Sequence, residues 1–488
     1  MRPALLVLAL TVLLACRSED PVVTLPDSRR VVFQAPVDRD PDVDVLFVVG
    51  TPNCMLEEQE QLRWAFPALL GSLGSPRFPS KMPNLHVGIV STDLGAGEQS
   101  WPGCQPGGDA ARLQYQPRRA GCTPPADPFI ALQDGVANVP GSSDAVTGVK
   151  EAFECIVELG NRGCGFIQAL ESARRALDAQ LAVNPGFLRP DALLAVVFVT
   201  NMDDCSVQDP ALFDPSPAAP DSLLGPPCRF RCFDLGFTCE CDGQPCARYS
   251  EVDGYVSFFN NLKPPGRVHL YAIASPDSGV VETTSSGGCM HVQRACTTAI
   301  GAANPTLRVK ALIDRFGDRG FYNTGLDLDN TRTEVKICSA SYEDGLRFAG
   351  RSILTALTAR CIPGPLLFAG PGASVACRAG DRPGSSASCP RSCLDRASCT
   401  VELAPGVPVQ RCPARLFDEP QLRDCGATCP CWRIVATPDC DPAVAGSPYG
   451  VEILDRQPTP PGSRVRIECL VSTYGWGSPA IDSLPMCP

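Results

Sequence analysis

The sequence predicts an α/β protein whose mainly parallel sheet carries helices on both faces, followed by a small disulfide-rich domain of β or irregular structure. Three observations lead to this prediction. Apolar strand-like runs alternate with amphipathic helix patterns between residues 42 and 361. Cysteine-rich stretches interrupt that alternation. From residue 362 to 488, helix periodicity is lost and Cys, Pro, Gly and Ser dominate.

The N-terminus has the features of a secretory signal. Arg2 precedes an apolar run at residues 4–15, which is too short to span a bilayer. Leu13-Leu14-Ala15-Cys16 resembles a bacterial lipobox, which implies that residues 1–15 are removed and that Cys16 carries a lipid. An ordinary signal peptide with an incidental cysteine is the alternative. Residues 16–41 are polar and contain proline, and we expect them to form a tether.

The composition limits the partners and the compartment. The chain has 488 residues, a net charge of −11 and no basic run, so we expect no nucleic-acid binding. Its 27 cysteines favour an oxidising compartment outside the cytosol. Fifteen of them lie between Cys54 and Cys361 and 11 between Cys377 and Cys487. Because both counts are odd, either one disulfide joins the two regions or each region holds an unpaired thiol.

Each element of the alternation has its own signal. The buried run that starts at Val43 ends in small and turn-forming residues, and a helix pattern follows at once. Ala192–Thr200 is the most hydrophobic run and predicts a central strand. In chain order, the expected helices are 55–73, a face from 166 to 181, 250–262, 306–316 and 344–357, and the expected strands are 43–49, 85–90, 192–200, 267–274, 432–436, 450–454 and 464–470.

The cysteine positions suggest several disulfides. Cys104 and Cys122 form a plausible bridge within a loop-rich stretch. The candidates in the first region are Cys104, Cys122, Cys155, Cys164, Cys289, Cys296, Cys338 and Cys361. Residues 205–246 contain six cysteines, enough for an insertion with three bridges of its own. A zinc site is the alternative, but this segment has no histidine and the compartment favours oxidation.

The order and spacing of several motifs resemble one known family. The segments that are similar to von Willebrand factor A-like domains of Gram-negative lipoproteins are residues 43–55, 57–59, 85–95, 163–166, 197–200 with 203–206, and 337–339. The resemblance covers roughly residues 42–360. It implies a Rossmann-like sheet, and it implies adhesion or protein binding through a metal-ion-dependent site.

The metal-binding pattern of that family is degenerate here. In the family, an Asp and two Ser follow the first strand and a further Asp follows the central strand. The matching positions hold Gly50, Pro52, Cys54 and Asn201. Hard divalent ions need charged oxygen donors, so we expect the usual site to be absent. Asp93, Asp203 and Asp204 are the residual carboxylates, which offer weak calcium or magnesium binding. The alternative is that Asp203 and Asp204 cap a helix or turn in the following loop.

We therefore predict a lipid-anchored protein of the bacterial cell envelope. Adhesion or binding of an unknown protein or surface ligand is its expected function, with the outer membrane or cell surface favoured because Arg17 follows Cys16. No catalytic constellation is found. The alternatives are metal-assisted adhesion through the residual Asp cluster, a thiol-dependent enzyme at Cys54, and a purely structural envelope protein whose cysteine-rich tail makes the contacts.

Overall fold

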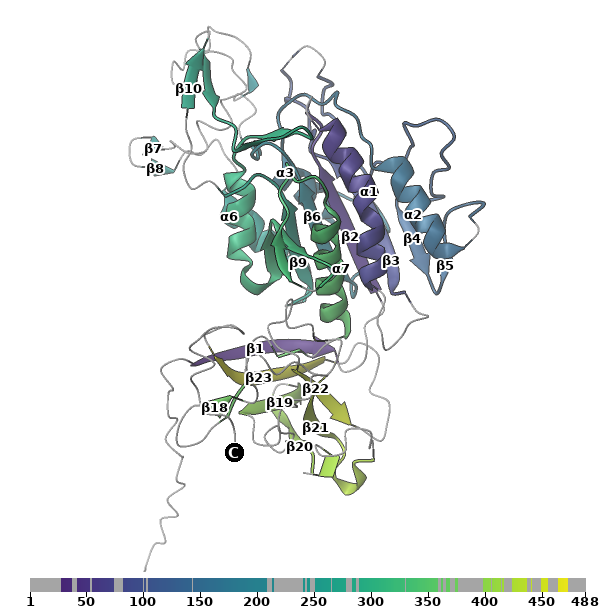
Figure 1. Cartoon of the computed structure of the whole chain (residues 1–488), viewed down its shortest axis with the longest axis vertical. Coiled ribbons are helices and arrows are strands. Elements are labelled where there is room, and N and C mark those ends of the chain that lie inside the picture. Colours follow the sequence, from purple (N-terminus) through teal and green to yellow (C-terminus); the bar gives the residue numbers. More distant parts are fainter. Residues whose placement is uncertain are drawn as a thin grey trace, which may run out of the picture.

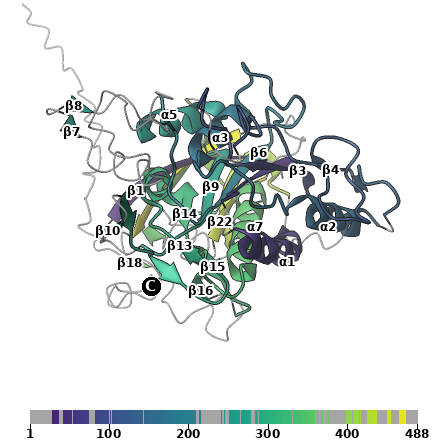
Figure 2. The same cartoon turned by 90° about the horizontal axis from the view of Figure 1, so that it is seen from above.

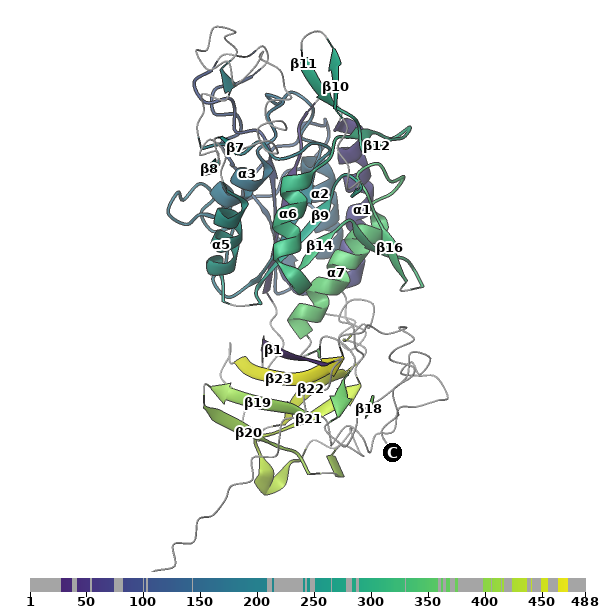
Figure 3. The ribbon, with the colours of Figure 1, turned by 90° about the vertical axis from the view of Figure 1, so that its left-hand side faces the viewer.

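The computed structural model describes most of residues 28–472. The described residues are 28–36, 42–52, 55–73, 82–99, 101, 104–142, 144–208, 213–214, 240–241, 244–245, 251–264, 266–277, 283–286, 289–329, 331–358, 361–362, 366–368, 374–375, 398–404, 406–413, 415–416, 424–436, 440, 449–454 and 464–472. They form two lobes stacked along the long axis (Figures 1 and 3). The larger lobe extends from residue 42 to residue 358, and the smaller lobe combines residues 28–36 with residues 361–472.

A seven-stranded sheet forms the centre of the larger lobe. Its strand order is β14-β9-β6-β2-β3-β4-β5. The strands are β2 (Asp42–Val49), β3 (Asn84–Ser91), β4 (Ile130–Gln133), β5 (Val136–Ala137), β6 (Leu193–Val199), β9 (Val268–Ile273) and β14 (Gly320–Tyr322). The helices are α1 (Leu56–Leu73), α2 (Ala145–Ile156), α3 (Ala169–Leu177), α5 (Val252–Leu262), α6 (Leu307–Arg315) and α7 (Glu343–Thr358).

The predicted fold class is wrong. The larger sheet is mixed, because β4 pairs with β3 in the antiparallel direction and β5 pairs with β4 in the same way. Over all the described residues, eleven strand pairings are antiparallel and five are parallel. The described residues contain six α-helices and 23 strands. A mainly parallel sheet with helices on both faces therefore does not describe the protein.

An Asp-Gly turn explains the antiparallel edge. Asp134 and Gly135 connect β4 to β5 and have φ angles of 51° and 82°. Both residues therefore lie in the left-handed region, which a two-residue hairpin of type I′ requires and which Asp-Gly favours. This edge and α2 lie on the opposite side of the lobe from the β10–β11 pair (Figure 2).

Two of the three hydrophobic clusters in the larger lobe contain alternate residues of β2. Val45 and Phe47 belong to one cluster, in which Phe66 of α1 stacks on Phe153 of α2 with ring centroids 3.7 Å apart. Leu46 and Val48 belong to the other cluster, which includes residues of α3, α5 and α6. Burial of β2 on both sides accounts for its continuous apolar run.

A six-stranded sheet, in the order β1-β23-β19-β20-β21-β22, forms the smaller lobe. Its strands are β1 (Ser28–Pro36), β19 (Cys399–Ala404), β20 (Val407–Arg411), β21 (Cys431–Ala436), β22 (Tyr449–Leu454) and β23 (Arg464–Ser472). The prediction of a tether over residues 16–41 is wrong for residues 28–36. These residues form β1, which pairs along its whole length with β23.

Short elements complete the described chain. They are β7 (Glu240–Cys241), β8 (Gln244–Pro245), β10 (Thr283–Ser286), β11 (Cys289–Val292), β12 (Cys296–Thr297), β13 (Ala302–Ala303), β15 (Thr324–Leu326), β16 (Arg332–Glu334), β17 (Leu367–Phe368), β18 (Ser374–Val375) and the 3-10 turns η3 (Gly317–Arg319) and η5 (Gly426–Thr428). Most of the cysteine-rich segment 205–246 lies outside the described residues.

The protein is rich in disulfides. Seven pairs join described cysteines: Cys104–Cys164, Cys122–Cys155, Cys296–Cys338, Cys361–Cys440, Cys399–Cys469, Cys412–Cys431 and Cys425–Cys429. The expected Cys104–Cys122 bridge is therefore wrong, because both cysteines pair with residues that lie beyond the β4–β5 hairpin. The side chain of Cys289 lies outside the described part.

One disulfide joins the two cysteine regions, residues 54–361 and 377–487. The odd number of cysteines in each region left such a bridge as one of two alternatives. Cys361 follows α7 and pairs with Cys440 in the smaller lobe. A main-chain hydrogen bond lies next to this disulfide: Ile362 N donates to Tyr449 O at 2.9 Å. The chain passes between the two lobes after β1 and again after α7, and α7 also contacts β1.

Candidate functional site

The carboxyl ends of β2, β3 and β6 lie at the end of the larger lobe that faces away from the smaller lobe (Figure 1). Residues 50–52, 92–93 and 201–204 follow these three strands directly. We call these segments, together with residues 160–164, the rim. Ligand-binding groups of such sheets gather at this edge. The side chains of Thr51, Thr92 and Asn201 are buried here, so the rim is closely packed.

Gln59 of α1 joins two segments of the rim. Its Nε2 atom donates to Gly50 O and to Gly160 O, each at 2.9 Å, and its Oε1 atom accepts from Gly160 N at 2.9 Å. Gly50 N in turn donates to Val199 O at 2.9 Å. A Cβ atom at Gly50 would lie 3.3 Å from the side chain of Met55. The position where the family has an acid is therefore crowded.

The loop at residues 160–164 lies directly against the first loop. Gly163 N donates to Thr51 O at 3.2 Å, and a Cβ atom on Gly163 would lie only 2.5 Å from Thr51 Oγ1. Pro52 is buried beside this contact. Cys54, the third position of the degenerate pattern, lies outside the described residues.

Asp93 makes hydrogen bonds to the main chain. Its Oδ1 atom accepts from Gly95 N at 2.8 Å, and its Oδ2 atom accepts from Cys164 N at 3.2 Å. Burial raises the pKa of this carboxyl group, and the two N–H groups oppose that shift. The Cys104–Cys164 disulfide also ties this loop to the segment that contains Cys104. Asp93 thus joins two loops of the rim, and each of its carboxylate oxygens accepts a hydrogen bond from the main chain.

Asp203 and Asp204 cap helices. Asp204 Oδ1 accepts from Leu170 N at 2.9 Å, at the start of α3, and its Oδ2 atom pairs with Arg308 Nε at 3.2 Å. Asp203 Oδ1 accepts from Arg308 N at 2.9 Å, at the start of α6. Burial raises the pKa of Asp203 to about 7. Both residues therefore make the capping contacts that were the alternative to metal binding. The helices that they cap, α3 and α6, lie far from residues 203–204 in the sequence.

Asn201 makes one hydrogen bond through its side chain and one through its backbone. Its Nδ2 atom donates to Ala302 O at 3.3 Å, and its carbonyl oxygen accepts from Asn304 N at 2.9 Å. Asn201 therefore joins β6 to the loop before α6. Among the described residues, no group of three or more His, Cys, Asp or Glu side chains is placed to hold a metal ion. The three residual carboxylates do not come together as a cluster.

Two of the three histidines, His86 and His269, lie away from the rim, where a thiol enzyme at Cys54 would need them. His86 and His269 stand near the amino ends of β3 and β9, at the opposite end of the sheet from the rim. His86 Nδ1 lies 2.8 Å from Phe187 O, and burial lowers the pKa of both rings. The side chain of His291 is outside the described part.

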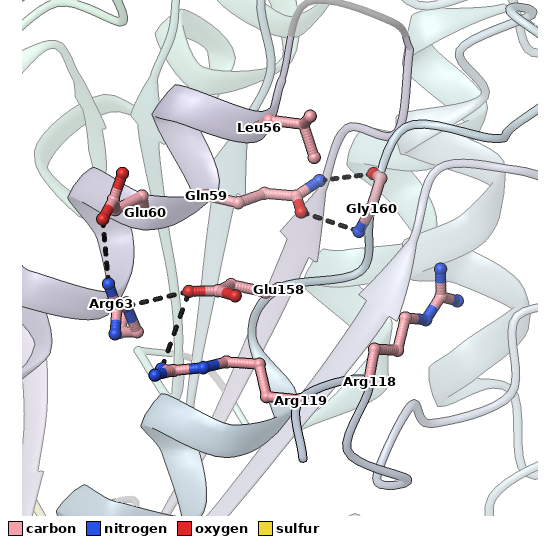
Figure 4. A pocket seen from close by; sticks show the side chains of 8 residues that line it. All are labelled: Leu56, Gln59, Glu60, Arg63, Arg118, Arg119, Glu158 and Gly160. Atoms are coloured by element: carbon pink, nitrogen blue, oxygen red, sulfur yellow. Dashed lines mark hydrogen bonds and ion pairs between the residues drawn. The ribbon is translucent and has the colours of Figure 1, made fainter.

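A pocket of about 450 Å³ opens beside the rim, between α1 and two loops. Leu56, Gln59, Glu60, Arg63, Arg118, Arg119, Glu158 and Gly160 line it. Figure 4 shows Arg63 and Arg119 directed toward Glu158, while Arg118 stands on the other wall near Gly160. Nothing in the sequence indicates this pocket, because Arg118 and Arg119 come from a loop with no periodic pattern and Arg63 belongs to α1.

Other residues that shape the rim could not be identified from the sequence. Gln59 lies in the family-like motif but carries no motif role, and Arg308 is about 100 residues from its partner Asp204 in the sequence. Only tertiary structure brings such pairs together. No helix in the described part of the chain is both long and apolar enough to cross a membrane. Cys16, the expected lipid attachment site, lies outside the described residues.

Comparisons with known proteins identify no family. No protein-family profile matches the sequence, and no curated protein is significantly similar to it. The solved structures found include proximal thread matrix protein 1 of the mussel byssus, at 8% identity and a TM-score of 0.22 over 49% of this chain and 39% of that one. Human COPII-coat protein Sec24c gives 7% identity and a TM-score of 0.29, covering 91% of this chain and 46% of that chain.

The pilus adhesin SpaC of Lactobacillus rhamnosus GG gives 10% identity and a TM-score of 0.30, covering 92% of this chain and 42% of that chain. This chain thus spans less than half the length of each of these three structures. TM-scores of 0.22 to 0.30 are too low to support any conclusion about fold or function.

Proposed function

We propose that the protein is a lipid-anchored binding protein of the bacterial envelope, which recognises a protein partner through the rim of its larger lobe and performs no catalysis. One observation carries this proposal. The rim lies at the end of the molecule away from the smaller lobe, and the chain enters the smaller lobe first, through β1 (Figure 1). An anchor at the N-terminus and a binding surface at the far end suit an adhesin or receptor.

The reach of the N-terminal segment supports this orientation. Eleven residues, 17–27, lie between Cys16 and Ser28. A chain of that length spans at most about 40 Å, whatever its conformation. A lipid on Cys16 therefore keeps β1 and the smaller lobe near the membrane. The motif resemblance to von Willebrand factor A-like lipoproteins supports binding as the function class at the level of sequence.

The packing of the rim favours a scaffold over a metal site. The oxygens of Asp93 and Asp204 accept hydrogen bonds from main-chain N–H groups and from Arg308. The Gln59 amide and the Cys104–Cys164 disulfide tie the loops together. Loops held in this way present a fixed surface, which lowers the entropy cost of binding a partner.

The anchor is tested by a Cys16→Ser variant. The wild-type protein is expected in the membrane fraction of cells, and the variant is expected in the soluble periplasmic fraction or the medium. Cys54→Ser, processed in parallel, serves as the control for a general effect of losing a cysteine. A Cys16→Ser protein that remains in the membrane fraction would show that the anchor assignment is wrong.

Binding is tested by capture from the native envelope. Full-length tagged protein is cross-linked in intact cells, purified and analysed by mass spectrometry. We expect the same partner to be enriched in repeated experiments, relative to an unrelated lipoprotein with the same tag. If no protein or surface ligand is enriched, the binding function is wrong, and a structural role for the smaller lobe becomes the better account.

A further inference from the structure

The pocket beside the rim contains one arginine without a counter-ion in the described part of the chain. Arg63 pairs with Glu60 at 3.0 Å and with Glu158 at 2.9 Å, and Arg119 lies 3.9 Å from the same Glu158 oxygen. Two carboxylates are thus shared by two arginines. Arg118 is exposed and makes no described ion pair, although it lines the same pocket.

The Arg118 guanidinium lies against the main chain of Gly160, and both residues line the pocket. A Cβ atom on Gly160 would lie 3.2 Å from Arg118 Nη1. The Gln59 amide fixes Gly160, so this wall of the pocket is held in place. Arg118 therefore lies against a fixed main-chain surface, apart from the ion pairs of Arg63 and Arg119 with Glu158 (Figure 4).

Apolar side chains flank the pocket on α1. Leu56 is 45% exposed and Trp64 is 56% exposed. The Arg63 guanidinium lies 4.3 Å from the centre of the Trp64 ring, so the ring borders the charged lining. Exposed Trp and Arg side chains are the residues that contribute most at protein interfaces.

From these observations we propose that the pocket binds a carboxylate presented by an extended segment of the protein partner. Arg118 pairs with the carboxylate, and Leu56 and Trp64 contact the neighbouring apolar residues of the segment. Charge complementarity selects an acidic group, because the lining holds three arginines against two glutamates in a chain of net charge −11. This inference rests on the proposed binding function and names its surface.

Fluorescence anisotropy with labelled peptides and the purified full-length protein tests the inference. The first probe is acetyl-Gly-Leu-Glu-Leu-Gly-amide, and the second has Gln in place of Glu. A third carries the Gln core with a free C-terminal carboxylate, which distinguishes a terminal acid from a side-chain acid. We expect one of the two acidic peptides to bind at least about tenfold more tightly than the neutral one.

Two variants make the test specific. Arg118→Gln is expected to weaken binding of that acidic peptide about tenfold. Arg112→Gln removes an exposed arginine outside the pocket lining and is expected to leave the affinity unchanged. Far-ultraviolet circular dichroism on both variants checks that the fold is retained. Equal binding of acidic and neutral peptides, no binding of any peptide, or full binding by Arg118→Gln would each overturn the inference. Tighter binding of a sulfated polysaccharide such as heparin, again dependent on Arg118, would also overturn it.

Capture from the envelope separates this inference from the proposed function. If Arg118→Gln captures as much partner as the wild type, the pocket is not the contact and the binding function stands. If the wild type captures no partner, the proposed function fails, and the peptide titration still decides whether the pocket binds carboxylates.

Discussion

The side-chain amide of Gln59 and the main chain of Gly160 form two hydrogen bonds in opposite directions, each 2.9 Å long. The same Nε2 atom also donates to Gly50 O. One amide on α1 therefore joins the loop after β2 to the loop at residues 160–164. In a metal-dependent site an ion would connect such loops. Here a neutral side chain makes the connection.

Replacement of Gln59 by Ala is expected to lower the free energy of unfolding by about 1–3 kcal/mol. It removes three hydrogen bonds and leaves buried main-chain groups without partners. Gln59→Glu is expected to be at least as destabilising, because a carboxylate cannot donate to the two carbonyl oxygens. Denaturant unfolding with disulfides intact measures both, and Gln116→Ala, at an exposed glutamine, is the control. Unchanged unfolding of Gln59→Ala would contradict this role.

Glu58 gives a prediction about pH. The side chain is fully buried, and burial raises its pKa from 4.5 to about 7, with a smaller contribution from Glu57. The fold therefore favours the protonated acid. Its stabilisation is fully present below pH 4.5 and is lost as the pH rises toward 7 and beyond.

Glu58→Gln keeps the neutral shape and removes the ionisation. The variant is expected to be more stable than the wild type by about 1–3 kcal/mol at pH 8 and to differ little at pH 4. Glu57→Gln, which changes the exposed neighbouring acid, is the matched control and should show no such pH dependence. The measurement is denaturant unfolding at both pH values. A Glu58→Gln effect of the same size at pH 4 and pH 8 would rule out this explanation.

The Asp204–Arg308 pair gives a third prediction. Both side chains are buried, and their atoms lie 3.2 Å apart. Asp204→Asn is expected to cost about 3–5 kcal/mol of stability, because it leaves a buried guanidinium without full compensation. A double-mutant cycle with Arg308→Met should give a coupling energy of about 1–3 kcal/mol. Additive effects of the two substitutions would show that the pair does not hold α3 and α6 together.

Calcium and magnesium are expected to leave the protein unchanged. The oxygens of Asp93 and Asp204 are occupied by N–H donors, and divalent ions need several oxygen ligands at once. Isothermal titration calorimetry of the full-length protein with each ion tests this prediction. Stoichiometric binding in the micromolar range would favour metal-assisted adhesion through a different arrangement of the rim.

The positions of the buried elements could be predicted from the sequence. The apolar runs at residues 43–49, 85–90 and 192–200 coincide with β2, β3 and β6, and the helix pattern at 55–73 coincides with α1. Burial on both sides leaves an unmistakable continuous apolar run. Local periodicity says nothing of strand direction, so the antiparallel edge was missed, although Asp134-Gly135 is a strong hairpin signal.

Pairings over long distances could not be predicted. Nothing in Ser28–Pro36 indicates that it joins a sheet with residues more than 400 positions later, because β1 shows little periodicity and several of its side chains are exposed. The same holds for Cys104, whose partner lies 60 residues away. The loss of the metal-binding residues could be predicted from the sequence. The hydrogen bonds that Asp93, Asp203 and Asp204 accept could not, because they depend on tertiary structure.

Site-specific photo-crosslinking in intact cells tests the central claim most directly. A photoreactive residue replaces either Arg162, exposed on the rim, or Val407, which is 54% exposed on β20 of the smaller lobe. We predict that position 162 forms a covalent adduct with a protein partner and that position 407 forms none with that partner. An adduct at position 407 with none at position 162 would contradict the account, because the smaller lobe would then make the contacts.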